Sequence, residues 1–287
     1  MKHFLLFVIV IAALPAVAQK KKAAFNSMNR NEQSKFLDKQ WWLGFKAGVN
    51  LSNPVPQKKY SVVTPTNYTL ESTEKQYDHF NKPGMQATLE VTFSFKSFAI
   101  SAQPTYRSSK FTYANDISWR NSENPDEFLA LHFDQEQQID YADLPLLAKY
   151  EVLGYKLRPY LQVGIFYSIL LNATKSVSVT GTDHASGGIN DFKNEPVIVG
   201  AKDLFTNSWG LMGGAGVNYN LGNIRLVLDV AYRHGMSNIA NVDNRFSNDR
   251  LSGIGEAQDD LKLNNLVFSA GVLFPLRFLS KNYSAGD

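Results

Sequence analysis

Apolar and polar residues alternate most clearly between Met85 and Lys96. Every second residue from Met85 to Phe95 is apolar, and the residues between them are polar or charged. On a β-strand this pattern places the two kinds of side chain on opposite faces. The run is longer than most soluble strands and suits a tilted strand that crosses a bilayer. It therefore predicts a transmembrane β-strand.

Seven further segments share this pattern. The strands are expected at residues 41–51, 84–96, 97–113, 135–151, 156–171, 207–221, 223–235 and 262–276. The turns around Lys96, Gly154 and Gly222 are short, whereas the other connections are long and polar. Outer-membrane barrels have short periplasmic turns and longer extracellular loops. We expect an all-β protein, an eight-stranded antiparallel up-and-down transmembrane β-barrel, with periplasmic termini and its long loops outside a Gram-negative cell.

The predicted strands have one apolar face for lipid and one face with charges of both signs. The expected lumen charge network consists of Lys46, Glu90, Arg107, Asp143, Lys149, Arg225, Asp229 and Arg233. Lys96 and Glu151 are placed on the same face. Eight strands enclose a space that side chains just fill, so a paired network that closes the barrel is expected, with an ion path as the alternative. Removing Asp229 should then leave a lumen arginine unpaired.

Other residues refine the strand assignments. Pro104 and Pro145 fall inside strands, where each predicts a bulge or a break. The glycine-rich stretch at residues 210–216 lacks the lysine and serine of a phosphate loop and is assigned to a strand. Aromatic residues near strand ends suit two interfacial girdles, namely Trp41, Tyr106, Tyr113, Tyr160, Trp209, Tyr219, Tyr232 and Phe278.

The N-terminal segment has the pattern of an export signal. An apolar stretch at residues 4–14 precedes Ala16-Val17-Ala18, a small-residue cleavage site. The expected organisation is a signal peptide (1–18), a periplasmic leader (19–40), the barrel (41–278) and a periplasmic tail (279–287). After the signal, no apolar run is long enough for a transmembrane helix.

The composition of the chain limits the kinds of ligand and partner that are expected. The chain has no cysteine, which excludes disulfides and thiolate metal sites. Its net charge is +3 and its cations are scattered, so a nucleic-acid partner is not expected. Neither a metal nor a cofactor is expected. The partners expected are outer-membrane lipid, the barrel-assembly machinery and an unidentified protein of the cell envelope.

The last predicted strand carries the features of an assembly signal. A polar residue, a glycine two positions later and alternating hydrophobic residues ending in an aromatic resemble the β-signal that the barrel-assembly machinery reads. The residues concerned are Ser269, Gly271, Phe274, Leu276 and Phe278.

The long loops contain residues that could support hydrolysis. Asp78 lies beside His79, His132 lies near Asp134, and His184 occurs in a third loop. Spacing across separate loops does not establish a nucleophile–base pair, so no catalytic residue is assigned. In the second long loop, residues 124–127 (Asn-Pro-Asp-Glu) predict the start of a short helix that packs over the barrel mouth.

Four short motifs resemble the PorT-like family of outer-membrane β-barrel proteins. They lie at residues 44–51 (GFKAGVNL), 141–150 (YADLPLLAKY), 158–164 (RPYLQVG) and 232–239 (YRHGMSNI). The resemblance implies an integral outer-membrane barrel with a signal peptide, in a family whose named member is associated with type IX protein secretion. It supplies no catalytic residue set. We expect a non-enzymatic anchor or interaction scaffold, and the resemblance implies a role accessory to protein secretion. The alternatives are a small-solute pore and a loop-borne hydrolase.

Overall fold

The computed structural model describes residues 39–60, 74–152, 156–185, 188, 190–245 and 257–276. The predicted signal peptide, nearly all of the leader, the tail and Phe278 lie outside these residues. No helix in the described part of the chain has the length and apolar character to cross a membrane.

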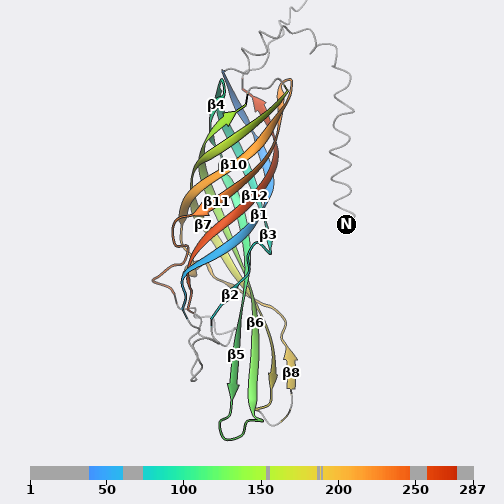
Figure 1. Cartoon of the computed structure of the whole chain (residues 1–287), viewed down its shortest axis with the longest axis vertical. Helices are drawn as coiled ribbons and strands as arrows, with labels where there is room; N and C mark the ends of the chain where they lie inside the picture. Colours follow the sequence, from blue (N-terminus) through green and yellow to red (C-terminus); the bar gives the residue numbers. More distant parts are fainter. Residues whose placement is uncertain are drawn as a thin grey trace, which may run out of the picture.

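The main element is a closed antiparallel sheet (Figure 1). Its strands are β1 (Lys39–Lys58), β3 (Pro83–Phe95), β4 (Phe98–Ala102), β5 (Thr105–Arg120), β6 (Phe128–Glu151), β7 (Leu157–Asp183), β10 (Ser208–Leu221), β11 (Ile224–Gly235) and β12 (Asp260–Pro275). Shorter elements are β2 (Gln76–Tyr77), β8 (Asn190–Lys193), β9 (Val197–Gly200) and the 3-10 helix η3 (Lys202–Leu204). The ring closes where β12 pairs with β1.

The β4 and β5 segments act as one strand of this ring. Both pair with β3 on one side and with β6 on the other, and the pairing register continues across Gln103 and Pro104. The described chain therefore forms an eight-membered ring, as predicted. Pro104 interrupts the strand without shifting its pairing register with β3 or β6. The break expected at Pro145 is wrong, because Pro145 stays in regular register with Phe166. The register shift lies instead between Asp140 and Tyr141 of β6, where β7 skips Leu171.

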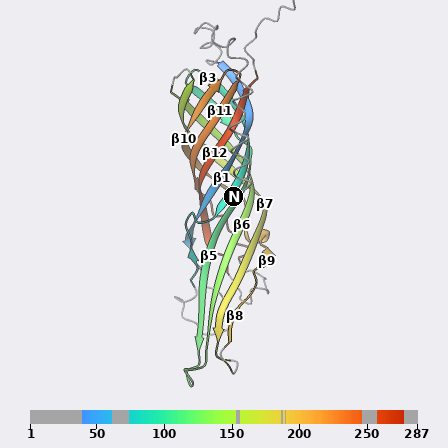
Figure 2. The ribbon, with the colours of Figure 1, turned by 90° about the vertical axis from the view of Figure 1, so that its right-hand side faces the viewer.

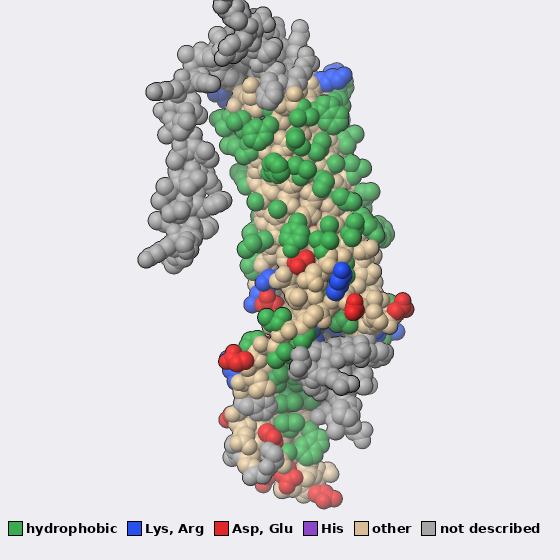
Figure 3. All heavy atoms as spheres, turned by 180° about the vertical axis from the view of Figure 1, so that it is seen from behind, with side chains coloured by type: hydrophobic (Ala, Val, Ile, Leu, Met, Phe, Trp, Pro, Cys, Tyr) green, Lys and Arg blue, Asp and Glu red, His purple; other side chains and the backbone are tan. Residues whose placement is uncertain are grey.

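The two faces of the barrel follow the predicted alternation. Outward residues such as Phe45, Leu144, Leu161 and Leu228 are at least half exposed to the surroundings of the barrel. On the face seen in Figure 3, hydrophobic side chains gather in a broad band over the barrel, with charged groups below it. In water such an apolar surface would promote aggregation, whereas in a membrane it is stabilised by contact with the hydrocarbon chains of the lipid. The band is therefore the lipid-facing belt.

Three strands continue well beyond the barrel (Figures 1 and 2). We call this extension the blade; it comprises residues 109–120 of β5, 128–139 of β6 and 173–183 of β7, with β8 and β9. The predicted ends at residues 113, 135 and 171 fall several residues short. Beyond the lipid belt the outer positions become polar, as at Thr112 and Ser118, so the outward apolar pattern that marked the predicted strands ends although the strands continue.

The helix predicted at residues 124–127 is wrong. These residues form the turn of the β5–β6 hairpin, whose last strand pair is Arg120 with Phe128. The Glu127 N–H donates to the Asn124 carbonyl, and the Asn121 and Asn124 amides donate to the Glu127 carboxylate. The residues that suggested a helix cap thus close a tight turn, because seven residues between paired strands leave no room for a helix.

Candidate functional site

The middle of the lumen contains a buried cluster of two lysines and two carboxylates. Lys46 Nζ lies 2.8 Å from Glu90 Oε2 and 3.0 Å from Asp229 Oδ2. Lys149 Nζ lies 2.6 Å from Glu90 Oε1. Tyr160 donates its hydroxyl to Asp229 at 3.1 Å. Asp229 therefore pairs with Lys46, and the expectation that its removal would leave a lumen arginine unpaired is wrong.

A second tier lies toward the blade. Asp143 accepts two hydrogen bonds from Arg107, at 2.7 and 3.2 Å, and its Oδ2 lies 2.9 Å from Arg233 Nη2. Arg107 also lies over the Tyr141 ring, and Arg233 lies over the Phe166 ring, 4.0 Å from its centroid. One buried carboxylate thus balances two guanidinium groups, with aromatic faces as further partners.

A third tier lies near the short turns. Glu151 contacts Arg225 at 2.9 Å and Arg158 at 3.0 Å, and it accepts a hydrogen bond from Asn218. Arg225 also stacks over Trp42 at 4.0 Å. Arg158 was not among the residues predicted for the lumen network, although the alternation of β7 places it inward. Lys96, in contrast, is exposed in a turn with φ of 54° and does not enter the lumen.

The eight residues predicted to form the lumen network are therefore all inward and buried. Arg225, Asp229 and Arg233 share a face of β11, as their spacing indicated, but each belongs to a different tier. The strands alone could not show this, because the partners come from across the ring.

Apolar side chains occupy much of the remaining lumen, which the sequence analysis did not anticipate. One cluster joins Trp42, Tyr160, Val227 and Leu273, and another joins Leu147, Phe166, Met212, Ala231 and Val267. Tyr160 and Tyr113 point inward, so their assignment to the interfacial girdles is wrong. The exposed aromatics Trp41, Tyr106, Trp209, Tyr219 and Tyr232 remain on the outer face.

An apolar plug closes the blade end of the lumen. It consists of Phe111, Tyr113, Ile139, Tyr141, Ala173, Ala201, Phe205, Ile239, Leu261 and Leu263. Phe205 and Ala240 form an isolated β-bridge, and the Ile239 N–H donates to the Leu261 carbonyl. The segments that follow η3 and β11 are thereby fixed across the barrel mouth.

The glycine-rich stretch belongs to β10, as predicted. Gly216 pairs with Tyr160, and Gly210 pairs with Phe166, on the neighbouring strand β7. A Cβ atom at Gly216 would lie 2.5 Å from the Tyr160 hydroxyl and 2.6 Å from the Leu228 carbonyl oxygen. These glycines therefore make room for the aromatic side chains that fill the lumen.

The described residues of the predicted assembly signal lie on both faces of β12. Ser269 points inward, and Phe274 and Leu276 point outward. In the closed ring both edges of β12 are paired, with β1 and with β11. Recognition by the assembly machinery stays a prediction.

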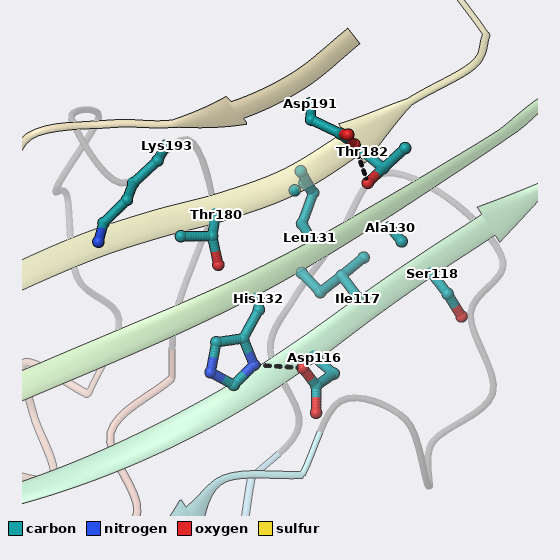
Figure 4. A pocket seen from close by; sticks show the side chains of 11 residues that line it. Asp116, Ile117, Ser118, Ala130, Leu131, His132, Thr180, Thr182, Asp191 and Lys193 are labelled. Carbon is teal, nitrogen blue, oxygen red and sulfur yellow. Dashed lines mark hydrogen bonds and ion pairs between the residues drawn. The ribbon is translucent and has the colours of Figure 1, made fainter. Parts of the chain in front are cut away.

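The exposed face of the blade carries a histidine between two carboxylates; Figure 4 shows the His132 ring and one of the two, Asp116. His132 Nδ1 lies 2.5 Å from Asp116 Oδ1, and Nε2 lies 3.2 Å from Asp134 Oδ1. The hydrogen bond with Asp116 raises the pKa of His132, and the charge of Asp134 adds to the effect. Asp116 and His132 border a shallow, open depression of about 650 Å³.

This arrangement does not resemble a catalytic pair. Both imidazole nitrogens of His132 are occupied by carboxylates, and Ser118 points away from the ring in Figure 4. His79 contacts Asn53, and His184 stacks on Phe128. In the described ranges, no group of three or more His, Cys, Asp or Glu residues has the arrangement to hold a metal ion.

The closed sheet, lipid-facing belt and charged interior define a small transmembrane β-barrel. The chain matches the model of the family described as "Outer membrane protein beta-barrel domain" over residues 18–241, and it belongs to that family. It is thus an outer-membrane protein of a Gram-negative bacterium.

Similar solved structures include three small barrels. Neisserial surface protein A is 11% identical, with 82% of this chain and 96% of that chain covered and a TM-score of 0.32. Ail of Yersinia pestis, in complex with the heparin analogue sucrose octasulfate, is 10% identical, with 82% and 99% covered and a TM-score of 0.29. The outer membrane protease OmpT of Escherichia coli is 12% identical, with 85% and 100% covered and a TM-score of 0.39. No curated protein matches the chain.

Proposed function

We propose that this protein is a non-enzymatic outer-membrane anchor that presents its blade to another protein at the cell surface. The observation that carries the proposal is the contrast between the two ends of the barrel. At the short-turn end the strands finish within a few residues of the lipid belt, whereas at the other end three strands continue as an ordered sheet. Such an extension is unnecessary for closing a barrel, and it gives a partner a large preformed surface.

The filled lumen favours this role over that of a pore. The three ionic tiers and the plug place buried side chains at successive levels of the barrel. A conducting path would require ion pairs and aromatic stacks to separate in several tiers at once. The engaged nitrogens of His132 likewise favour binding over hydrolysis, because a general base needs a free nitrogen directed at a nucleophile.

The orientation is part of the proposal. With periplasmic termini and turns, the blade lies outside the cell, as the usual arrangement of bacterial barrels implies. We also propose that the chain belongs to the PorT-like branch and is accessory to protein secretion. The four motifs support this branch; a strain lacking the protein should then accumulate secreted proteins in the periplasm.

The proposal can be tested with a shortened blade. A variant in which a two-residue turn replaces residues 115–133 keeps all barrel pairings and should still reach the outer membrane. A strain making only this variant should show the same defect as a strain lacking the protein. Full wild-type behaviour with the shortened blade would overturn the proposal.

Conductance separates the anchor from the pore. Purified wild-type protein in planar bilayers should give no stable ion conductance. A double variant, Lys46→Ala with Asp143→Ala, removes the ion pairs that these two residues make in the first and second tiers. It serves as the conducting control. Steady wild-type channels that resemble those of the control would establish the pore instead.

A further inference from the structure

We infer that the outer edge of β5 in the blade is a docking site for a basic, extended segment of a partner protein, which adds to the sheet as a further strand. This inference rests on the proposed function, since it names the part of the blade that binds and the chemistry of its partner.

The backbone groups of this edge point away from the sheet. The Gln103 N–H donates to Pro145 of β6, and the Asn121 N–H donates to Glu127, so odd-numbered residues of this strand face β6. Leu89 of β3 and Asp78 donate to the carbonyls of Pro104 and Thr112, so even-numbered residues face the opposite side. Asp116, Ser118 and Arg120 therefore direct both backbone groups outward.

The described chain leaves this edge open. β2 pairs with β5 only at Tyr113 and Ala114, and within the described residues no strand pairs with β5 beyond that point. The side chains of Asp116, Ser118 and Arg120 are exposed. The opposite edge of the blade differs, because β8 covers residues 180–183 and β9 covers residues 174–177 of β7. An unpaired strand edge is a ready template for another strand.

Charge defines the partner. Residues 114–135 and 178–196, the distal part of the blade, contain eight carboxylates, and their cations are only Arg120 and Lys193, so their formal charge is −6 with histidines neutral. The complete chain carries +3. The blade thus concentrates negative charge, visible as acidic side chains toward its tip in Figure 3. Acidic surfaces attract basic segments and repel a second copy of the same blade.

The side chains beside the edge specify the partner further. Asp116 and Ser118 lie on the polar face with His132 and Asp134, whereas Ile117 lies on the opposite face and is buried with Phe133 and Val177. An added strand also alternates its side chains between the two faces. The best-matched segment therefore has Lys or Arg at every second position, with apolar residues between them, over about six residues.

A synthetic peptide of alternating lysine and valine is the probe. Its binding to detergent-solubilised full-length protein is measured by fluorescence anisotropy, beside a glutamate–valine peptide. The lysine peptide should bind, and its binding should weaken with added salt. It should also slow amide hydrogen exchange at Asp116 and Ser118. The glutamate peptide should not bind.

Ser118→Pro is the decisive variant, with Ser118→Ala as its matched control. A proline at this position removes an outward N–H, and a strand edge tolerates that without losing the β5–β6 ladder. Ser118→Pro should weaken peptide binding at least tenfold, and Ser118→Ala less than twofold. Equal binding by the proline and alanine variants would overturn the edge site.

Two other outcomes would also decide the matter. If a disulfide forms readily between two copies of Ser118→Cys, the edge joins second copies and the basic-partner inference is wrong. If the peptide fails to bind while the shortened blade still abolishes function, this site is wrong but the anchor role stands. If the shortened blade keeps full function, the anchor role itself fails.

Discussion

Asp143, like Glu151, is a lumen carboxylate that balances two guanidinium groups. It is buried and shared by Arg107 and Arg233, which lie on different strands. Losing one partner of a buried ion pair leaves a charge that water cannot solvate fully, at a cost of about 3–5 kcal/mol. Exposed pairs such as Lys59 with Glu74 contribute about 0–1 kcal/mol.

Asp143→Ala should therefore lower the free energy of unfolding by about 3–5 kcal/mol, because it leaves two guanidinium groups without their carboxylate. Glu74→Ala, the control, should change it by less than about 1 kcal/mol. Urea titration of protein folded in liposomes measures both. A loss for Asp143→Ala as small as that of the control would mean that water replaces the carboxylate.

Gly216 offers a second test at this scale. Gly216→Ala should destabilise the barrel by about 1–3 kcal/mol, because the new Cβ overlaps Tyr160 and the backbone of Leu228. Gly213→Ala is the matched control on the same strand, since its Cβ would meet nothing nearer than 4.0 Å. Heat-modified mobility on gels with increasing temperature compares the two. Equal melting would show that Tyr160 can move aside.

At the scale of elements, the blade combines strong strand pairing with an exposed polar face. The pKa of His132 is raised, so protonation is favoured in the folded hairpin. A raised pKa stabilises the folded state below the unfolded pKa of about 6.5, and this contribution disappears as the pH rises through the folded pKa. The charged groups near this face are Asp116 on β5, Asp134 on β6, and Asp191 and Lys193 on β8.

NMR titration of the His132 imidazole should give a midpoint above about 6.5, the ordinary value. Asp116→Asn removes the main cause of the shift and should bring the midpoint down. The protection factors of the hairpin amides, which are corrected for the intrinsic pH dependence of exchange, should be larger at acidic pH than above the midpoint in the wild type. A midpoint that Asp116→Asn leaves unchanged would contradict the assigned cause.

The sequence predicted the strands inside the membrane far better than those outside it. Hydrocarbon forces every second residue to be apolar, so the pattern and the register of Phe45, Leu144 and Leu228 could be read directly. Beyond the belt, the outward positions of β5–β7 are polar and the opposite face mixes polar with apolar residues, as at Asn115 and Ile117, so the period-two signal weakens. Similarly, alternation identified Lys46 and Asp143 as inward, but their partners depend on the curvature of the ring and lie far away in sequence.

At the scale of the whole molecule, the barrel has one lipid-facing belt. Leu228→Arg places a charge in the belt and should destabilise the barrel by about 2–4 kcal/mol if the residue lies near the midplane. Ser118→Arg in the blade, the control, should change stability little. The inward neighbour Val227 is a poor control, since it packs among Trp42, Tyr160 and Leu273. Urea titration in liposomes gives the comparison.

Epitope tags test the orientation. A tag at Ser122 in the blade turn should bind antibody on intact cells, and a tag at Gly222 should bind only after the outer membrane is opened. Labelling of Gly222 alone would invert the topology. Both sites are turns, so neither insertion interrupts a strand.

The position of Lys46 has a consequence for the order of folding. Its two carboxylate partners lie on β3, its neighbour in the ring, and on β11, 183 residues away in the sequence. The contact with β11 can form only when β12 has met β1. In an unclosed sheet, Lys46 would lack its β11 partner, and an unpaired charge in the hydrocarbon core costs free energy. Ring closure and membrane insertion are therefore coupled. Chains whose strands are only partly paired should accumulate at the bilayer surface, and insertion should proceed in one cooperative step.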